Sequence, residues 1–203
     1  MSLDNAAMTV FGDSISGNCL KVKFVADLLG IAHDWVETSV LKGETRTAEF
    51  LAMNPAGQVP VVRFADNRAL SQSNAIMLHL AEGSELIPAD SFERALMVQW
   101  LFWEQYSHEP AIAVLRFHKF YLKKPDSEID PALPAKCNKV LVLMNSHLEN
   151  REYFVGEKLS LADIALVAYT RFAHQAGLDL ARTPHVAAWV RMIENDLGIE
   201  HLI

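Results

Sequence analysis

The apolar pattern of this chain changes once, at residues 82–90, which read E-G-S-E-L-I-P-A-D. Before this stretch, short β-compatible runs alternate with helical stretches, and after it the apolar residues follow helical spacing only. Glycine, serine and proline gathered at the point of change are typical of a linker. We therefore expect an α/β domain over residues 8–83, followed by an all-α domain over residues 91–203.

The first domain is predicted to follow the order β-α-β-α-β-β-α. Its strands are expected at 8–11, 35–38, 59–64 and 69–70, and its helices at 17–29, 45–53 and 74–82. Gly30 and Gly83 supply stop signals, and Ser73 is placed to cap the last of these helices.

The second domain is predicted to be a helical bundle. Residues 91–123 read as one long, aromatic-rich helix with Pro110 as a kink. Asp130-Pro131 and Thr183-Pro184 open further helices. S-L-A-D at 160–163 is a capping box that opens a very apolar helix.

Composition excludes several classes of function. The 203 residues are 51% hydrophobic and 21% charged, as in a globular protein with a sizeable core. A net charge of −7 with scattered Lys and Arg argues against nucleic-acid binding. No apolar run approaches the roughly 20 residues that span a bilayer. Two cysteines indicate a reducing, cytoplasmic setting, and no metal-ligand spacing is present. Residues 1–7 are expected to be a leader before a native start at Met8.

The stretch S-I-S-G-N-C-L at 14–20 places a hydroxyl where a C-x-x-C redox motif has its first cysteine. Ser16 is by itself best interpreted as a helix cap. Ser14 and Asn18 lie near enough to share any role that Ser16 has in chemistry. The broken motif argues against a dithiol oxidoreductase.

Two further places admit both a structural and a functional interpretation. Pro60, inside an apolar strand pattern, favours an edge position or a strand's first residue over a cis peptide bond. Ser73 is a sufficient cap, yet Gln72, Ser73 and the free N–H groups of the helix would together bind a carboxylate well.

Four motifs taken together resemble the cytosolic glutathione transferases. They are S-x-x-C after the first strand, N-P-x-G-x-V-P at 54–60, Q-S-N-A-I at 72–76 and S-L-A-D-I-A at 160–165. The resemblance covers residues 8–203. It implies a thioredoxin-like first domain with a cis Pro60, followed by a helical bundle. It also implies glutathione as co-substrate and a hydrophobic electrophile as substrate, as in a detoxification transferase.

The resemblance also implies roles for single residues. Ser16 would donate a hydrogen bond to the glutathione thiolate, and Cys19 would be an apolar filler. The backbone of Val59 would pair with the cysteinyl part of glutathione. Gln72 and Ser73 would hold the γ-glutamyl group, and Lys42 the glycyl carboxylate.

The electrophile pocket is expected between the domains, with Tyr106, His108 and Arg116 on the long helix as its polar residues. The aromatic load from Trp100 to Phe120 predicts a homodimer, and the resemblance points to one that pairs unlike domains of two subunits. Such an interface would cover residues 66–68 and the start of the long helix.

Two alternatives remain open at this point. The chain could be a non-catalytic relative of these transferases, serving as a ligand carrier or partner-binding scaffold. As an enzyme, it could conjugate glutathione to its substrate or use glutathione for reduction or isomerisation.

Overall fold

The computed structural model describes residues 8–202 and divides the chain into two units, one ending at Ser84 and the other beginning at Glu85. The leader expected at residues 1–7 lies outside the described residues. Among the helices of residues 8–202, none combines the length and apolar character needed to cross a membrane.

The first unit is built on a four-stranded sheet in the order β2-β1-β3-β4. Its elements are β1 (Met8–Gly12), α1 (Gly17–Leu28), β2 (His33–Glu37), a 3-10 turn at Glu44–Arg46, α2 (Ala48–Met53), β3 (Val61–Arg63), β4 (Ala69–Ser71) and α3 (Ser73–Leu80). β1 runs parallel to β2 and antiparallel to β3, and β3 runs antiparallel to β4. The predicted thioredoxin-like order is therefore confirmed.

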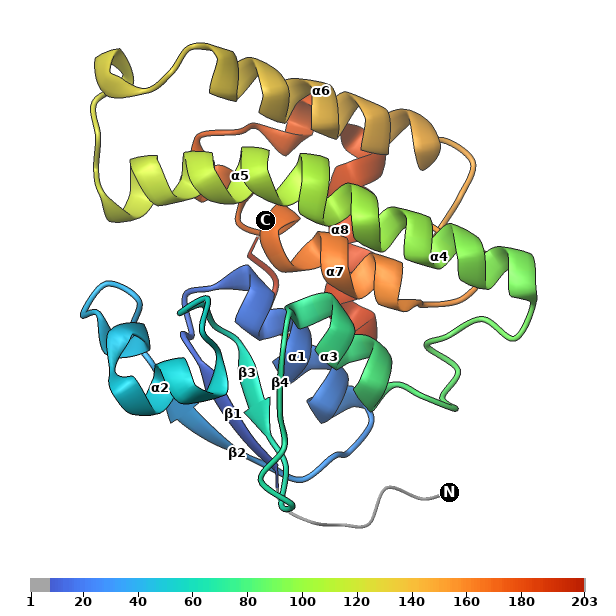
Figure 1. Ribbon diagram of the computed structural model, residues 1–203. Coiled ribbons are helices and arrows are strands. Elements are labelled where there is room, and N and C mark those ends of the chain that lie inside the picture. The colour runs from blue at the N-terminus through green and yellow to red at the C-terminus, as the bar shows by residue number, and fades with distance from the viewer. Residues whose placement is uncertain (1–7, 203) are drawn as a thin grey trace. The chain divides into compact units, whose positions relative to one another are not determined.

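Alternation along the strands and periodicity along the helices produce the core of this unit. β1 buries every second residue, and α1 and α3 pack side by side (Figure 1). The fully buried apolar side chains from these elements include Val10, Val22, Val61, Val62 and Met77. Burial of each such side chain contributes about 1.5–3 kcal/mol, which holds the helices against the sheet.

Within the described residues, the secondary-structure elements of the second unit are all helices. It contains α4 (Ser91–Trp103), α5 (Glu109–Arg116), α6 (Ala132–His147), α7 (Leu161–Thr170) and α8 (Pro184–Asp196), with 3-10 turns at Asp126–Glu128, Ala173–Ala176 and Leu180–Arg182. Every residue of α7 is buried, so α7 is the central helix of the bundle. Its first turn carries the predicted capping box between Ser160 and Asp163.

α4 and α5 form one continuous rod in Figure 1, joined by a π-helical segment at Glu104–His108. A second π-helical segment follows α5 at Phe117–Tyr121. Pro110 lies in the first turn of α5, directly after the first π segment. The wider turn accommodates a residue that lacks a backbone N–H, which is how the long helix continues past the proline.

Candidate active site

The strand register brings three parts of the sequence to one end of the sheet. Phe11 of β1 pairs with Val61 of β3, and Val61 pairs with Ser71 of β4. Val59 lies two residues before Val61, Ser73 lies two residues after Ser71, and the loop with Ser16 follows β1. These predicted residues therefore gather at the same end of the sheet.

Ser16 is the N-cap residue of α1, with extended backbone angles (φ −85°, ψ 121°). Its N–H donates to the Asp13 carbonyl at 2.9 Å, and its carbonyl accepts from the Leu20 N–H at 3.0 Å. The hydroxyl makes no capping bond to the helix. A hydroxyl that does not cap its own helix is placed to serve another acceptor at the helix N-terminus.

Cys19 is fully buried beneath this loop and accepts a hydrogen bond from the Asp13 N–H at 3.3 Å. Burial raises the pKa of its thiol to about 12. The thiol is therefore protonated at neutral pH and packs as a small apolar side chain, as expected.

Ser14 and Asn18, the two other candidate donors to the glutathione thiol, form hydrogen bonds with other residues. The Ser14 hydroxyl and N–H both contact Glu37 Oε1, at 3.0 and 2.9 Å. The Asn18 side-chain oxygen accepts from Lys21 Nζ at 2.8 Å and from the Ser73 hydroxyl at 3.1 Å. Both side chains thus brace neighbouring elements.

The motif N-P-x-G-x-V-P forms a braced turn that ends in a cis bond between Val59 and Pro60. The Asn54 side chain donates to the Gln58 carbonyl at 2.7 Å and accepts from the Ala56 N–H at 3.2 Å. Gly57 has φ +63°, a backbone conformation that favours glycine, and it faces the Arg46 guanidinium. A side chain at this position would be strained and would collide with Arg46.

The cis bond confirms what the resemblance implied for Pro60. The edge-strand interpretation is wrong, because β3 lies inside the sheet between β1 and β4. Pro60 precedes β3 directly, where its missing N–H removes no ladder bond. No residue in 8–202 pairs with the backbone N–H or C=O of Val59.

At the start of α3, the structure corrects the predicted cap. Gln72, rather than Ser73, is the N-cap residue, and its carbonyl accepts from the Ile76 N–H at 2.9 Å. Gln72 has φ +72° and an exposed side chain, whereas Ser73 is 5% exposed in the first turn. A non-glycine residue at positive φ costs of order 1–3 kcal/mol, and such strain is concentrated at functional sites.

Lys42 lies on an exposed loop that is tied to the β1–α1 loop through Asp13. The buried Asp13 carboxylate accepts from the Val40 N–H at 2.9 Å and from the Ile15 N–H at 3.2 Å. It therefore holds the Lys42 loop and the Ser16 loop together. Sequence reasoning missed this role, although a carboxylate directly after a strand and before a helix was an available signal.

The residues predicted for the electrophile pocket lie in the second unit, in different environments. Tyr106 is 88% exposed, whereas His108 is fully buried, with Nε2 2.8 Å from the Thr170 hydroxyl. These contacts place one side chain in solvent and the other inside the bundle.

Arg116 is also held inside the second unit, at 3% exposure. Its guanidinium donates to Gln175 Oε1 and to the Tyr121 hydroxyl, both at 2.7 Å, and stacks 4.0 Å above the Phe172 ring. Burial lowers its pKa from the ordinary value. Arg116, His108 and Tyr106 do not form one polar cluster.

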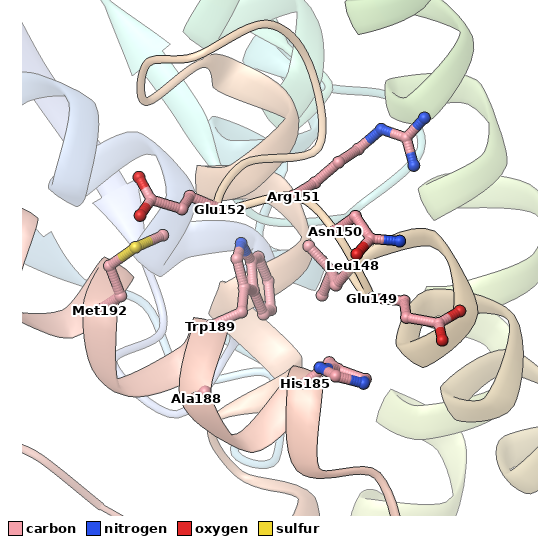
Figure 2. Close-up of a pocket in the computed structure, with 9 residues that line it drawn as sticks. All are labelled: Leu148, Glu149, Asn150, Arg151, Glu152, His185, Ala188, Trp189 and Met192. Carbon is pink, nitrogen blue, oxygen red and sulfur yellow. The ribbon is translucent and has the colours of Figure 1, made fainter.

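A separate cavity of about 420 Å³ lies between α8 and residues 148–152 (Figure 2). Trp189 stands at its centre, with Met192 and Glu152 on one side and His185 and Glu149 on the other. The Trp189 indole N–H donates to Asp163 Oδ1 at 3.1 Å, so the ring belongs to the bundle core. None of the residues predicted for catalysis or ligand binding lines this cavity. Within residues 8–202, no group of three or more His, Cys, Asp or Glu side chains is arranged to hold a metal ion.

Known proteins match this chain over both of its units. Residues 15–82 match the family model of the glutathione S-transferase N-terminal domain, and residues 100–196 match that of the C-terminal domain. Glutathione S-transferase F10 of Arabidopsis thaliana is 30% identical over 173 residues, which cover 79% of this chain and 80% of that protein.

Solved structures give the same result at higher identity. A glutathione S-transferase from Pseudomonas fluorescens is 42% identical with a TM-score of 0.89, covering 92% of this chain and 94% of that one. A glutathione S-transferase from Xanthobacter autotrophicus is also 42% identical with a TM-score of 0.89, and 96% of each chain is covered. The chain belongs to the glutathione S-transferase family.

Proposed function

We propose that Ser16 is the catalytic residue of this glutathione transferase and donates a hydrogen bond to the thiolate of bound glutathione. The enzyme uses glutathione as co-substrate and activates its thiol for attack on an electrophilic small molecule. The observation that carries the role of Ser16 is its position: an N-cap hydroxyl with no capping bond at the start of α1.

The interaction free energies available at Ser16 are large enough to lower the pKa of the glutathione thiol. A free thiol with a pKa near 8.5 is only about 3% ionised at pH 7, and lowering that pKa by about two units takes roughly 2.7 kcal/mol. One charge-assisted hydrogen bond contributes about 1.5–3 kcal/mol, and a helix N-terminus adds about 0.3–1 kcal/mol. Ser16 at the start of α1 can supply the whole shift.

We propose that residues at the same end of the sheet contact the rest of glutathione. The backbone N–H and C=O of Val59 pair with the cysteinyl part. Gln72 and Ser73 hold the γ-glutamyl group at the start of α3, where first-turn N–H groups have no intrahelical acceptor. Lys42 meets the glycyl carboxylate from its exposed loop.

For the electrophile, we propose that Tyr106 makes direct contact, because its side chain is accessible. For His108 and Arg116, which are buried, we propose an indirect part in this pocket. Their contacts inside the bundle shape the helix that carries Tyr106. The substrate we propose is a hydrophobic electrophile, and the role is detoxification in the cytoplasm, which the two free buried cysteines support.

Titration of the bound thiol tests the role of Ser16. The ultraviolet absorbance of the glutathione thiolate, followed over pH in the complex, should give an apparent pKa of the bound thiol at least one unit below that of free glutathione. The Ser16→Ala variant should return the pKa towards the free value. An unshifted pKa in the unmodified enzyme would contradict the proposed mechanism and leave the family assignment intact.

Turnover distinguishes the remaining alternatives. Retention on immobilised glutathione together with conjugation of an aryl halide supports the enzyme, whereas retention without turnover on any electrophile supports a scaffold. Conjugation is separated from glutathione-dependent reduction by the product, which is a thioether in the first case and glutathione disulfide in the second.

A further inference from the structure

Lys21 is a buried cation in the α1–α3 pair that the mechanism above does not use. Its side chain is 0% exposed, and its ammonium nitrogen lies 2.8 Å from Asn18 Oδ1 and 3.4 Å from Asn74 Oδ1. Asn18 is in the first turn of α1, and Asn74 is in the first turn of α3. A buried ammonium is costly unless it is hydrogen-bonded, and these amide oxygens bridge it to both helices.

The ammonium also fixes the direction of a hydrogen bond at the candidate site. An ammonium carries three donors and no acceptor, so the Asn18 atom that faces it is the carbonyl oxygen. The same oxygen lies 3.1 Å from Ser73 Oγ. The Ser73 hydroxyl must therefore be the donor in that pair, and its single proton points at Asn18.

We propose that Lys21 and Asn18 are positioning residues for the γ-glutamyl subsite, and that they act through Ser73. They lock the first turn of α3 against the first turn of α1. With the hydroxyl proton of Ser73 directed at Asn18, the γ-glutamyl carboxylate is received by backbone N–H groups of the first turn of α3. This inference rests on the proposed binding of glutathione at the start of α3.

The expected effect is confined to binding of one part of the ligand. Asn18→Ala and Lys21→Met should each weaken glutathione binding about tenfold, as loss of a hydrogen bond that serves a charged group would. Turnover at saturating glutathione should change less than about twofold, because the γ-glutamyl group does not react. Lys23→Met is the matched control, since Lys23 is exposed on the same helix and pairs with Asp27.

The experiment measures the dissociation constants of two ligands by calorimetry. They are glutathione and its analogue with 4-aminobutanoyl in place of the γ-glutamyl group, which lacks only the α-carboxylate. Asn18→Ala should weaken glutathione binding and leave the analogue within about twofold. Asn18→Ala and Ser73→Ala should also be non-additive, because the two variants remove the same hydrogen bond.

Several outcomes would overturn the inference. They are equal losses for both ligands, additive effects of Asn18→Ala and Ser73→Ala, or reduced turnover with unchanged binding. If Lys21→Met does not fold, the Asn18 and Ser73 variants decide the question alone. If the unmodified protein fails to bind glutathione, it is the proposed function that falls, and that result is seen before any variant is made.

Discussion

At the scale of single residues, the proposed site separates the Ser16 hydroxyl, which we expect to contact the reacting sulfur, from groups that we expect to hold the rest of the ligand. Ser16→Ala should lower turnover about 10- to 100-fold, the kinetic equivalent of one charge-assisted hydrogen bond. Glutathione affinity should change far less, because the bond is strongest to the thiolate. Steady-state kinetics over both substrates measures the two effects separately.

Ser14→Ala is the matched control for this measurement. Its hydroxyl donates to Glu37, and its loss should leave turnover unchanged. If Ser14→Ala abolishes turnover while Ser16→Ala has no effect, the proposed donor is the wrong one.

Gln72 gives a second prediction at the residue scale, because its φ of +72° suits glycine better than glutamine. Gln72→Gly should therefore be more stable than Gln72→Ala, by about 1 kcal/mol, since both lose the side chain and only glycine relieves the backbone. Both variants should weaken glutathione binding. Equilibrium urea unfolding and calorimetry provide the two readouts, and equal stability of the two variants would show that Gln72 is not strained.

At the scale of elements, the capping box of α7 concentrates four donors on one buried carboxylate. Asp163 accepts from the backbone N–H groups of Phe154 and Ser160, from the Ser160 hydroxyl and from the Trp189 indole. Burial nevertheless raises its pKa to about 6, with the hydrogen bonds opposing the rise. The carboxyl therefore takes up a proton in the folded state at a higher pH than in the unfolded chain.

The pH dependence of stability follows from this shift. A folded-state pKa of about 6 above the ordinary 3.8 gives stability that is present below pH 3.8 and lost as pH rises through about 6. The quantity to compare is the free energy of unfolding of the unmodified protein minus that of the Asp163→Asn variant. This difference should fall by about 2–3 kcal/mol between pH 4 and pH 7.5. Urea unfolding at several pH values measures it, and a difference that grows with pH would contradict the prediction.

Elements with local signals could be predicted from the sequence. The strand-helix order of the first unit follows from periodicity and stops such as Gly30, and the α7 start follows from S-L-A-D. The N-cap of α3 was misplaced by one residue. Ser73 has the side chain of a cap, but Gln72 adopts the N-cap conformation at positive φ, which a glutamine gives no reason to expect.

Features that depend on distant contacts could not be predicted from the sequence alone. Asn18 and Ser73 are 55 positions apart, and Lys21 and Asn74 are 53 apart, so no local pattern connects them. The cis bond before Pro60 also lacked a local signal, because cis and trans X-Pro bonds differ by only about 0.5–1 kcal/mol. The family motifs supplied that feature by resemblance.

At the scale of the whole molecule, the aromatic side chains of the long helix divide into two groups. Trp100 is 8% exposed and packs edge-on against Trp103, His147 and Phe154, so it belongs to the bundle core. Phe92 and Phe102 are 70% and 73% exposed. Exposed positions at 92, 95, 99 and 102 follow a spacing of three and four, which places them on one stripe of α4.

This exposed stripe is the surface that we expect a second copy of the chain to cover, because a monomer rarely leaves large aromatic side chains such as Phe92 and Phe102 in water along one helix face. Closed two-fold dimers are the commonest arrangement, and a stable one buries about 1,200–2,000 Å² in total. Light scattering at micromolar concentration should therefore report about twice the chain mass of 22.7 kDa.

The double variant Phe92→Glu, Phe102→Glu should shift the mass to that of a monomer. Val142→Glu, at a 59% exposed position on α6, should leave it unchanged. A monomeric unmodified enzyme that still turns over glutathione would show that the stripe serves another purpose, and loss of the dimer in Val142→Glu would move the interface to α6.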